Sequence, residues 1–209
     1  MTPQEVRDLL EATGAVRRGH FQLSSGLHSP TYVQCALLLQ HPAHAARVAE
    51  ALARRLGESA VDVVAAPALG GIVLGYELAR QLDARAIFAE RNSEGRLSLR
   101  RGFALRPGER VLVAEDVVTT GGSTRETIEV VRQAGGQVVG VAALIDRSSG
   151  GVQLGVRLEA LLTENIEAYP PDACPLCRDR LPLEKPGSRP ALSTAGPAPP
   201  TTKPAPRSA

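Results

Sequence analysis

Residues 111–124 read VLVAEDVVTTGGST, which combines an apolar run, two carboxylates and a glycine-containing loop. A continuous apolar run predicts a buried strand, and two adjacent carboxylates, Glu115 and Asp116, follow at its carboxyl end. A loop of small and hydroxyl-bearing residues comes next, and a helix is predicted over 123–134. In an open α/β sheet, ligands bind beyond the carboxyl ends of the strands. The stretch therefore predicts a ligand site at this strand–loop–helix junction.

The loop after the two carboxylates is suited to a phosphate. Gly121 and Gly122 let backbone N–H groups approach an anion, and the helix N-terminus adds a favourable dipole. Ser123 and Glu126 form a capping-box pattern that marks this N-terminus. The Gly-Lys-[Ser/Thr] ending of a Walker loop is missing. Since carboxylates repel phosphate, the acidic pair suits sugar hydroxyls or a developing positive charge; the alternative is an ordinary turn with Asp116 as a solvated cap.

Strands and helices alternate on both sides of this stretch. Apolar runs predict strands over 61–66, 84–89 and 138–145, besides 110–115 in the stretch itself. Helical spacing predicts helices over 42–56 and 71–82. A capping box with Pro3 at the first helical position predicts an N-terminal helix that ends near Gly14, followed by short strands over 21–23 and 32–38. The pattern predicts an α/β fold with a mostly parallel sheet that is flanked by helices.

Composition limits the function classes. The net charge of +2 favours neither nucleic acid nor an acidic membrane as a partner. The longest uncharged apolar stretch, 63–76, is broken by Pro67, Gly70 and Gly71 and is too short to span a bilayer. With no secretory signal and an odd number of cysteines, the chain is expected to be cytoplasmic. Its two lysines are Lys185 and Lys203, so a catalytic lysine would have to lie outside residues 1–184.

The acidic pair and its loop resemble the phosphoribosyl-pyrophosphate (PRPP) motif of the type I phosphoribosyltransferases. This resemblance implies the type I phosphoribosyltransferase fold, in which the acidic pair binds the 2- and 3-hydroxyls of ribose and the loop binds the 5-phosphate. Asp116 is the expected catalytic carboxylate. The PRPP-binding residues implied are Glu115, Asp116, Val117, Val118, Thr119, Thr120, Gly121, Gly122 and Ser123.

Two further segments resemble the orotate phosphoribosyltransferases, and the likeness extends over about residues 1–165. Residues 21–32, FQLSSGLHSPTY, match the pattern Phe-x-Leu-x-Ser-Gly-x-x-Ser-Pro of the small N-terminal hood in that family, here about residues 1–40. A generic Gly/Pro turn is the alternative. Arg147 ends a strand, and the resemblance implies that its planar guanidinium holds the carboxylate of orotate. Thr119 is expected to contact orotate as well.

A third loop lies between a predicted strand and a predicted helix. By resemblance it binds pyrophosphate through Ala68, Leu69, Gly70 and Gly71. A plain turn explains the two glycines nearly as well. Many members of the family carry a lysine in this loop and another in the hood, where this chain has Gly70 and Ser24.

The expected mobile segment, 90–101, contains arginines and no lysine or histidine. Arginine neutralises pyrophosphate but donates a proton poorly, because its pKa exceeds roughly 12. Charge stabilisation is thus retained without lysine acid catalysis, and Arg91 is the candidate catalytic contact to the transition state. Arg96, Arg100 and Arg101 fit a solvated loop.

The sequence Cys174-Pro175-Leu176-Cys177 has the spacing of a zinc knuckle, but it supplies only two ligands. A structural zinc site shared across a dimer axis, a redox pair and no metal all stay open. Beyond this segment (170–185), residues 186–209 are rich in Pro and Ala and are expected to form a disordered tail. Residues 1–185 are expected to form the phosphoribosyltransferase domain.

The resemblance implies that PRPP and orotate react, with Mg²⁺ as the cofactor, to give orotidine 5-phosphate and pyrophosphate in the synthesis of UMP. It also implies a homodimer whose mobile loop reaches the neighbouring site. Two alternatives remain. One is a phosphoribosyltransferase for uracil, xanthine or hypoxanthine, although purine enzymes commonly stack an aromatic side chain on the base and only three Phe and three Tyr are present. The other is a non-enzymatic regulator that binds a nucleotide and RNA, which the small net charge disfavours.

Overall fold

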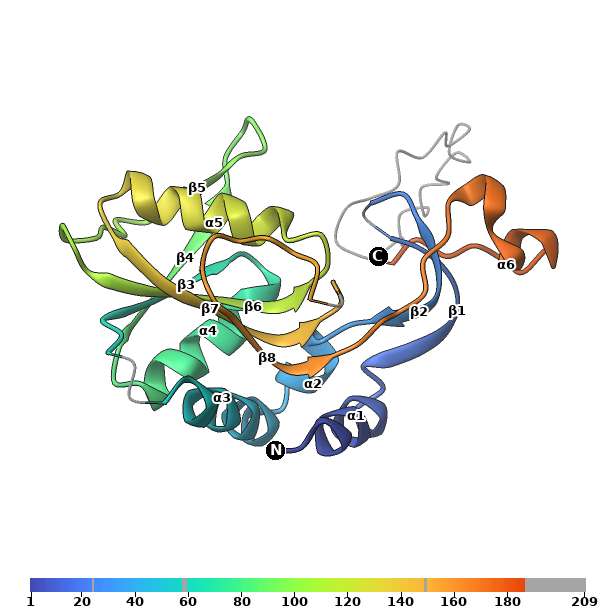
Figure 1. The fold of residues 1–209 in the computed structure, drawn as a ribbon, viewed down its shortest axis with the longest axis horizontal. Coiled ribbons are helices and arrows are strands. Elements are labelled where there is room, and N and C mark those ends of the chain that lie inside the picture. Colours follow the sequence, from blue (N-terminus) through green and yellow to red (C-terminus); the bar gives the residue numbers. More distant parts are fainter. Residues whose placement is uncertain (24, 58–59, 149, 187–209) are drawn as a thin grey trace, which may run out of the picture.

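A six-stranded sheet with strand order β5-β4-β3-β6-β7-β8 forms the centre of the molecule (Figure 1). The computed structural model describes residues 1–23, 25–57, 60–148 and 150–186. Five of the six strands run parallel, and β5 pairs antiparallel with β4. The strands are β3 (Val63–Pro67), β4 (Arg85–Arg91), β5 (Leu97–Leu99), β6 (Arg110–Val118), β7 (Gln137–Asp146) and β8 (Leu158–Thr163). The predicted mostly parallel sheet is confirmed.

Helices cover both faces of the sheet (Figure 1). One face packs against α5 (Gly122–Gln133), whose Val131 and Ile128 contact the side chains of Val111 and Val113. The other face packs against α1 (Pro3–Ala12), α2 (Ala36–Leu39), α3 (Pro42–Leu56) and α4 (Gly70–Gln81). Because side chains alternate along a strand, Glu115 continues the row that faces α5 and Asp116 continues the row that faces α4. The two side chains thus start toward different faces of the sheet, although their carboxyl groups remain close enough to interact with each other.

The N-terminal region confirms one prediction and corrects another. In α1, the side chain of Thr2 accepts from the N–H of Glu5, and the Glu5 carboxylate accepts from the N–H of Thr2, as the capping box predicts. The strand predicted over 32–38 is wrong, because the strand ends at Val33 and residues 36–39 form α2. The run Ala-Leu-Leu-Leu has a high helix propensity, and the helix buries Leu38 and Leu39 in the core.

A separate two-stranded antiparallel sheet forms the hood, from β1 (Val16–Gln22) and β2 (His28–Val33). The C-terminal segment after β8 returns to this hairpin and carries η1 (Pro171–Ala173) and α6 (Pro175–Arg178) (Figure 1). Tyr169 bridges to His28 of β2, and Glu184 bridges to Phe21 of β1. The segment therefore lies along both edges of the hairpin. Of the expected tail, only Pro186 belongs to the described residues, and 187–209 lie outside them.

The segment expected to be a polar loop, 90–101, contains a β-hairpin. Leu97 and Leu99 alternate with Ser98, and this period of two places Leu97 in a buried position against the sheet. Asn92 closes the turn, because its Oδ1 accepts from the N–H groups of Glu94 and Arg96 at 3.0 Å each.

The sequence did not predict β8, which lies at one edge of the sheet. Its mixture of apolar and charged residues lacks the continuous apolar run of the other parallel strands. Among the described helices, none has the length and apolar character needed to cross a membrane.

Candidate active site

The junction between β6 and α5 has the geometry of an anion site. Gly121 occupies the left-handed region, with φ of 71°, and turns the chain into α5. A Cβ at this position would lie 2.5 Å from Cγ2 of Val152, so both the conformation and the space require glycine. The first N–H groups of α5 have no partner within the helix and face the loop. They are available to bind a phosphate.

The capping box predicted for α5 is wrong. The N-cap residue is Gly121, which has no side chain to accept a hydrogen bond. Ser123 instead donates its hydroxyl to Oε2 of Glu115 at 2.7 Å, and Glu126 forms an ion pair with Arg91. Ser123 thus holds a buried carboxylate of the site, which leaves the helix N-terminus free for a ligand.

Burial dominates the electrostatics of the acidic pair. Glu115 is 4% exposed, and burial together with the adjacent charge of Asp116 raises its pKa to about 8. Burial also raises the pKa of Asp116, although the N–H of Val117 donates to its Oδ1 at 2.9 Å and opposes this rise. A negative charge on either carboxylate therefore costs free energy, and hydroxyl donors or a nearby cation would offset this cost.

The loop of residues 68–71 lies directly against Asp116. A Cβ on Gly70 would lie 2.7 Å from Oδ2 and 2.8 Å from Oδ1 of Asp116, and a Cβ on Gly71 would lie 3.0 Å from the carbonyl oxygen of Ala114. The peptide bond between Ala68 and Leu69 is cis. The structure therefore brings the expected pyrophosphate loop and the expected ribose carboxylate together, and only glycine permits the approach.

A cavity of about 530 Å³ lies between the hood and the carboxyl ends of β6 and β7, a volume typical of small-molecule sites. It brings together Asp116, Thr119 and Arg147, which the sequence placed in one site. The hood and the C-terminal segment complete the wall. The lining residues are Gln22, Leu23, Ser25, Gly26, Tyr32, Val33, Gln34, Asp116, Val117, Thr119, Thr120, Arg147, Lys185 and Pro186. Ser24, which the hood motif includes, lies outside the described residues.

Arg147 is partly buried at this cavity with part of its guanidinium unpaired. Its backbone N–H donates to the carbonyl of Val118 at 2.7 Å, which fixes the start of the side chain. Its Nε is buried and has no hydrogen-bond partner among the described residues, and burial lowers the pKa of the guanidinium. A buried donor without an acceptor is costly, so this geometry suits a planar anion such as a carboxylate.

Lys185 lines the cavity, and sequence reasoning did not assign it a role. Its neighbour Glu184 is held by two backbone hydrogen bonds of 2.8 Å, one to the N–H of Gln22 and one to the carbonyl of His20. The sequence contained a signal for this residue: residues 1–184 have no lysine, so Lys185 is the first lysine of the chain and the only one inside the predicted domain.

Arg91 does not line the cavity. Its guanidinium forms a 3.0 Å ion pair with Glu126 of α5 and donates to the carbonyl of Gly95. The other arginines of the hairpin also pair with carboxylates of the hairpin, Arg96 with Glu94 and both Arg100 and Arg101 with Glu90. Exposed pairs of this kind contribute little to stability, so a substrate anion could replace them.

Comparison with known proteins places these features in a family. The sequence profile described as "Phosphoribosyl transferase domain" matches residues 36–154. The chain is 54% identical to the orotate phosphoribosyltransferase of Desulforamulus reducens, over 90% of this chain and 98% of the relative. It is 51% identical to that of Thermotoga maritima, over 88% and 98%. The crystal structure of orotate phosphoribosyltransferase from Aeropyrum pernix superposes with a TM-score of 0.63 at 30% identity, over 76% of this chain and 93% of that one.

Proposed function

The chain belongs to the orotate phosphoribosyltransferase family, and from that premise we propose how its residues transfer a phosphoribosyl group from PRPP to orotate. The products are orotidine 5-phosphate and pyrophosphate, and the reaction belongs to pyrimidine biosynthesis. One observation carries the residue assignment: a single cavity unites the carboxylate of Asp116, the phosphate loop and the unpaired guanidinium of Arg147.

The ribose end of PRPP is assigned to β6 and the loop after it. The N-terminus of α5 binds the 5-phosphate through backbone N–H groups, with Thr119, Thr120, Gly121, Gly122 and Ser123 as the loop that surrounds it. Asp116 accepts from the ribose hydroxyls and, as pyrophosphate leaves, its charge stabilises the oxocarbenium-like sugar. Glu115 lies next to Asp116 and holds the start of α5 through Ser123. Val117 and Val118 contribute backbone between the two.

Orotate is assigned to the side of the cavity near Arg147 and the hood. The buried Nε of Arg147 lacks an acceptor, and a carboxylate supplies one in a charge-assisted, forked arrangement. Thr119 lines the same cavity and offers a hydroxyl to the base. Holding both reactants in line accounts for part of the rate enhancement, because it removes the entropy cost of their encounter.

The departing pyrophosphate is assigned to residues 68–71 and to cations. Lys185 supplies a positive charge from the cavity wall. The carboxylate of Asp116 also fits Mg²⁺, since this ion prefers oxygen ligands, keeps several waters and is bound largely through substrate phosphates. When bound, Mg²⁺ would neutralise the charge that develops on pyrophosphate.

A homodimer brings Arg91 into this scheme. Val73 and Tyr76 of α4 and Leu69, the N-cap residue before this helix, are 44%, 63% and 75% exposed, and they follow one another at spacings of four and three residues. An exposed apolar stripe of this kind favours a protein interface. In the dimer, Arg91 would leave Glu126 and contact pyrophosphate in the partner's site. We also retain residues 1–185 as one domain and the cytoplasm as its location, both as proposals.

Steady-state assays with PRPP and each of orotate, uracil, hypoxanthine and xanthine test the base assignment. We expect turnover with orotate to exceed turnover with every other base by at least 100-fold, because only orotate has a carboxylate for Arg147. Faster turnover with another base would overturn the assignment. Loss of turnover with all bases, together with RNA binding, would instead favour the non-enzymatic regulator.

A further inference from the structure

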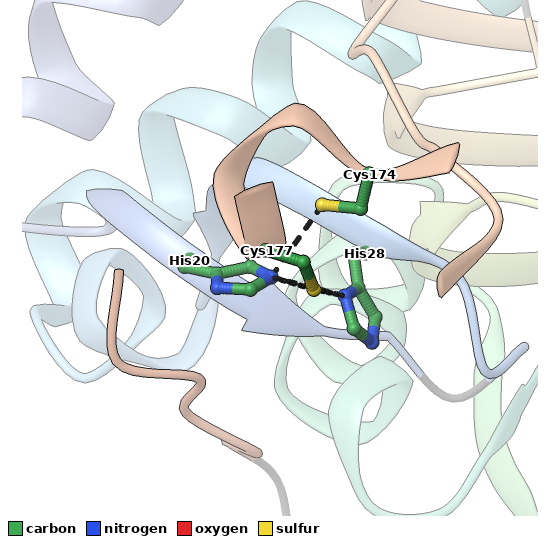
Figure 2. A group of neighbouring side chains, drawn as sticks. All are labelled: His20, His28, Cys174 and Cys177. Atoms are coloured by element: carbon green, nitrogen blue, oxygen red, sulfur yellow. Dashed lines mark hydrogen bonds between the residues drawn. The ribbon is translucent and has the colours of Figure 1, made fainter. Parts of the chain in front are cut away.

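Four potential metal ligands converge between the hood and the C-terminal segment (Figure 2). His20 comes from β1 and His28 from β2, whereas Cys174 and Cys177 come from the start of α6 and from α6 itself. Their side chains point toward one another, and one ligand atom from each lies within 4.8 Å of all the others. His20, His28 and Cys174 are buried, and none of the cysteines is in a disulfide. We call these four residues the clip.

The distances in the clip match those of a tetrahedral site. Nε2 of His20 lies 3.0 Å from Nδ1 of His28 and 3.6 Å from the sulfur of each cysteine, and the sulfur of Cys177 lies 3.3 Å from Nδ1 of His28. Zinc bonds of about 2.0–2.1 Å to nitrogen and about 2.3 Å to sulfur give separations of about 3.3 Å between nitrogens and about 3.6 Å between nitrogen and sulfur. These four separations are thus close to those of a tetrahedral zinc site, and the remaining two are within 4.8 Å.

The environment of His20 supports a cation at this point. Its Nδ1 lies 2.9 Å from the carbonyl oxygen of Leu181, so Nδ1 carries the proton and Nε2 presents a lone pair to the clip. A backbone carbonyl that fixes the tautomer of a ligand is typical of metal-bound histidine. Without a metal, one lone pair would face two thiols and a second ring nitrogen, although it can satisfy only one strong donor.

We propose that His20, His28, Cys174 and Cys177 bind one structural Zn²⁺ per chain. Soft thiolates with imidazoles select zinc over Mg²⁺, and two thiolates neutralise the dication in a mostly buried position. Four protein ligands leave no open coordination position, so the ion holds the fold and activates no water. All four ligands belong to one chain, which makes a site shared across a dimer axis unnecessary.

The zinc ion fixes the hood side of the active-site cavity. A two-stranded hairpin is marginally stable by itself, and the clip joins β1, β2 and α6 at one point. Gln22 and Leu23 follow His20 by two and three residues and line the cavity, as does Lys185 beyond the cysteines. This consequence for the cavity rests on the proposed function, whereas zinc binding itself does not.

Metal analysis of the full chain tests the site directly. The protein is purified without a histidine tag, because such a tag binds zinc, and elemental analysis is expected to find about one zinc per chain. Cys177→Ser, which changes the exposed ligand, is expected to lower the content at least tenfold. Cys35→Ser and His41→Asn, which remove a cysteine and a histidine outside the clip, are expected to retain it. Wild-type protein without zinc that also fails to bind added ZnCl₂ would overturn the proposal, as would a Cys174–Cys177 disulfide in the native protein.

Chelation of the wild-type protein provides a test that does not depend on a variant that folds. Removal of zinc is expected to lower the Tm by roughly 5–15 °C, and an equivalent of ZnCl₂ is expected to restore it. An unchanged Tm would exclude a structural role. In the same samples KM for orotate and PRPP is expected to rise more than kcat falls; an unchanged KM with a lowered Tm would remove the link to the cavity and leave the zinc site intact.

Discussion

The phosphate loop and the clip both collect polar groups around one charged ligand, but they do so in opposite ways. The proposed phosphate loop, residues 119–123, is one short piece of chain, offers backbone N–H groups and opens into the cavity at Thr119 and Thr120. The clip uses four side chains, two from the hood and two from a segment 146 to 157 residues away, and its ligand set is closed. A site that binds and releases substrate at every turnover needs open positions, whereas a site that holds two segments together does not.

The largest effect is expected in the open site. Asp116→Asn should lower kcat by about 10²–10³-fold, because it removes the charge that stabilises the oxocarbenium-like sugar and keeps the size of the side chain. The Tm should stay the same or rise, since burial raises the pKa of this carboxyl. Rapid-quench and thermal unfolding measurements check the two values. Asp8→Asn, which changes an exposed aspartate of α1, is the control; a well-folded Asp116→Asn enzyme with normal kcat would remove Asp116 from the mechanism.

The next effect concerns Arg147, which lies where the phosphate-loop side and the hood side of the cavity meet. Arg147→Ala should lower kcat/KM for orotate by about 30- to 1000-fold, because a charge-assisted forked contact in a dry site contributes roughly 2–4 kcal/mol. KM for PRPP should change little. Arg132→Ala, at the exposed end of α5, should leave both constants unchanged. Equal losses for orotate and PRPP would instead indicate that Arg147 supports the fold.

The contrast between the two regions also explains what the sequence could predict. The fold and the junction between β6 and α5 were predicted because contiguous patterns determine them: apolar runs for the strands and a strand–loop–helix motif for the junction. The capping box of α5 was wrong because Ser123 has a partner in β6, a tertiary contact that no local pattern contains. Helix α2 was missed for a different reason: the apolar run of residues 32–38 was interpreted as one strand, although Ala-Leu-Leu-Leu at its end has a high helix propensity.

The clip could not be predicted from local sequence patterns, because its ligands come from segments that are far apart in the sequence. The cysteine spacing indicated only two ligands, Cys174 and Cys177. His20 and His28 come from a hairpin that the sequence described as a hood, and their side chains meet the cysteines only after the chain returns from β8. Lys185 was missed for the same reason, since its place at the cavity depends on the pairing of Glu184 with β1.

Arg91 tests whether the open site is completed by a second subunit. Arg91→Ala should lower kcat by roughly 10- to 100-fold with little change in KM, because the contact forms as charge develops on pyrophosphate. Arg91→Lys should retain part of the rate, and Ser98→Ala in the same hairpin should have no effect. If Arg91→Ala leaves kcat intact, the role passes to Arg96, Arg100 or Arg101; if alanine at each of the four has no effect, the hairpin has no catalytic role.

A mixture of two impaired variants shows whether Arg91 acts in the site of its own chain or in the site of the neighbouring subunit. After subunit exchange between Arg91→Ala and Asp116→Asn, half of the dimers are mixed, and one of their two sites has both native residues if Arg91 acts across the interface. About a quarter of the wild-type activity should then return. If Arg91 acts within its own chain, no mixed dimer contains a complete site and activity stays at the level of the separate variants.

The smallest effect concerns the buried carboxylate beneath the open site. Burial and the charge of Asp116 raise the pKa of Glu115 to about 8, well above the 4.5 of an ordinary glutamate. Below pH 4.5 the group is protonated in both the folded and the unfolded chain. As the pH rises toward 8, the unfolded chain loses this proton first, so the free energy of unfolding falls across this window. We expect the Tm of the substrate-free enzyme to drop by about 3–6 °C between pH 5 and pH 9.

Glu115→Gln should flatten this pH dependence, because glutamine keeps an acceptor for the hydroxyl of Ser123 and never carries a charge. The variant should match the wild-type Tm near pH 5 and exceed it near pH 9, and the measurement is a set of unfolding curves across that range. Glu129→Gln, an exposed change on α5, should follow the wild-type curve. A Glu115→Gln curve that falls as steeply as the wild type would show that another group, with Asp116 as the nearest raised carboxyl, is responsible for the loss. The loss of stability at high pH would then come from the buried carboxylate of Asp116, which lines the cavity.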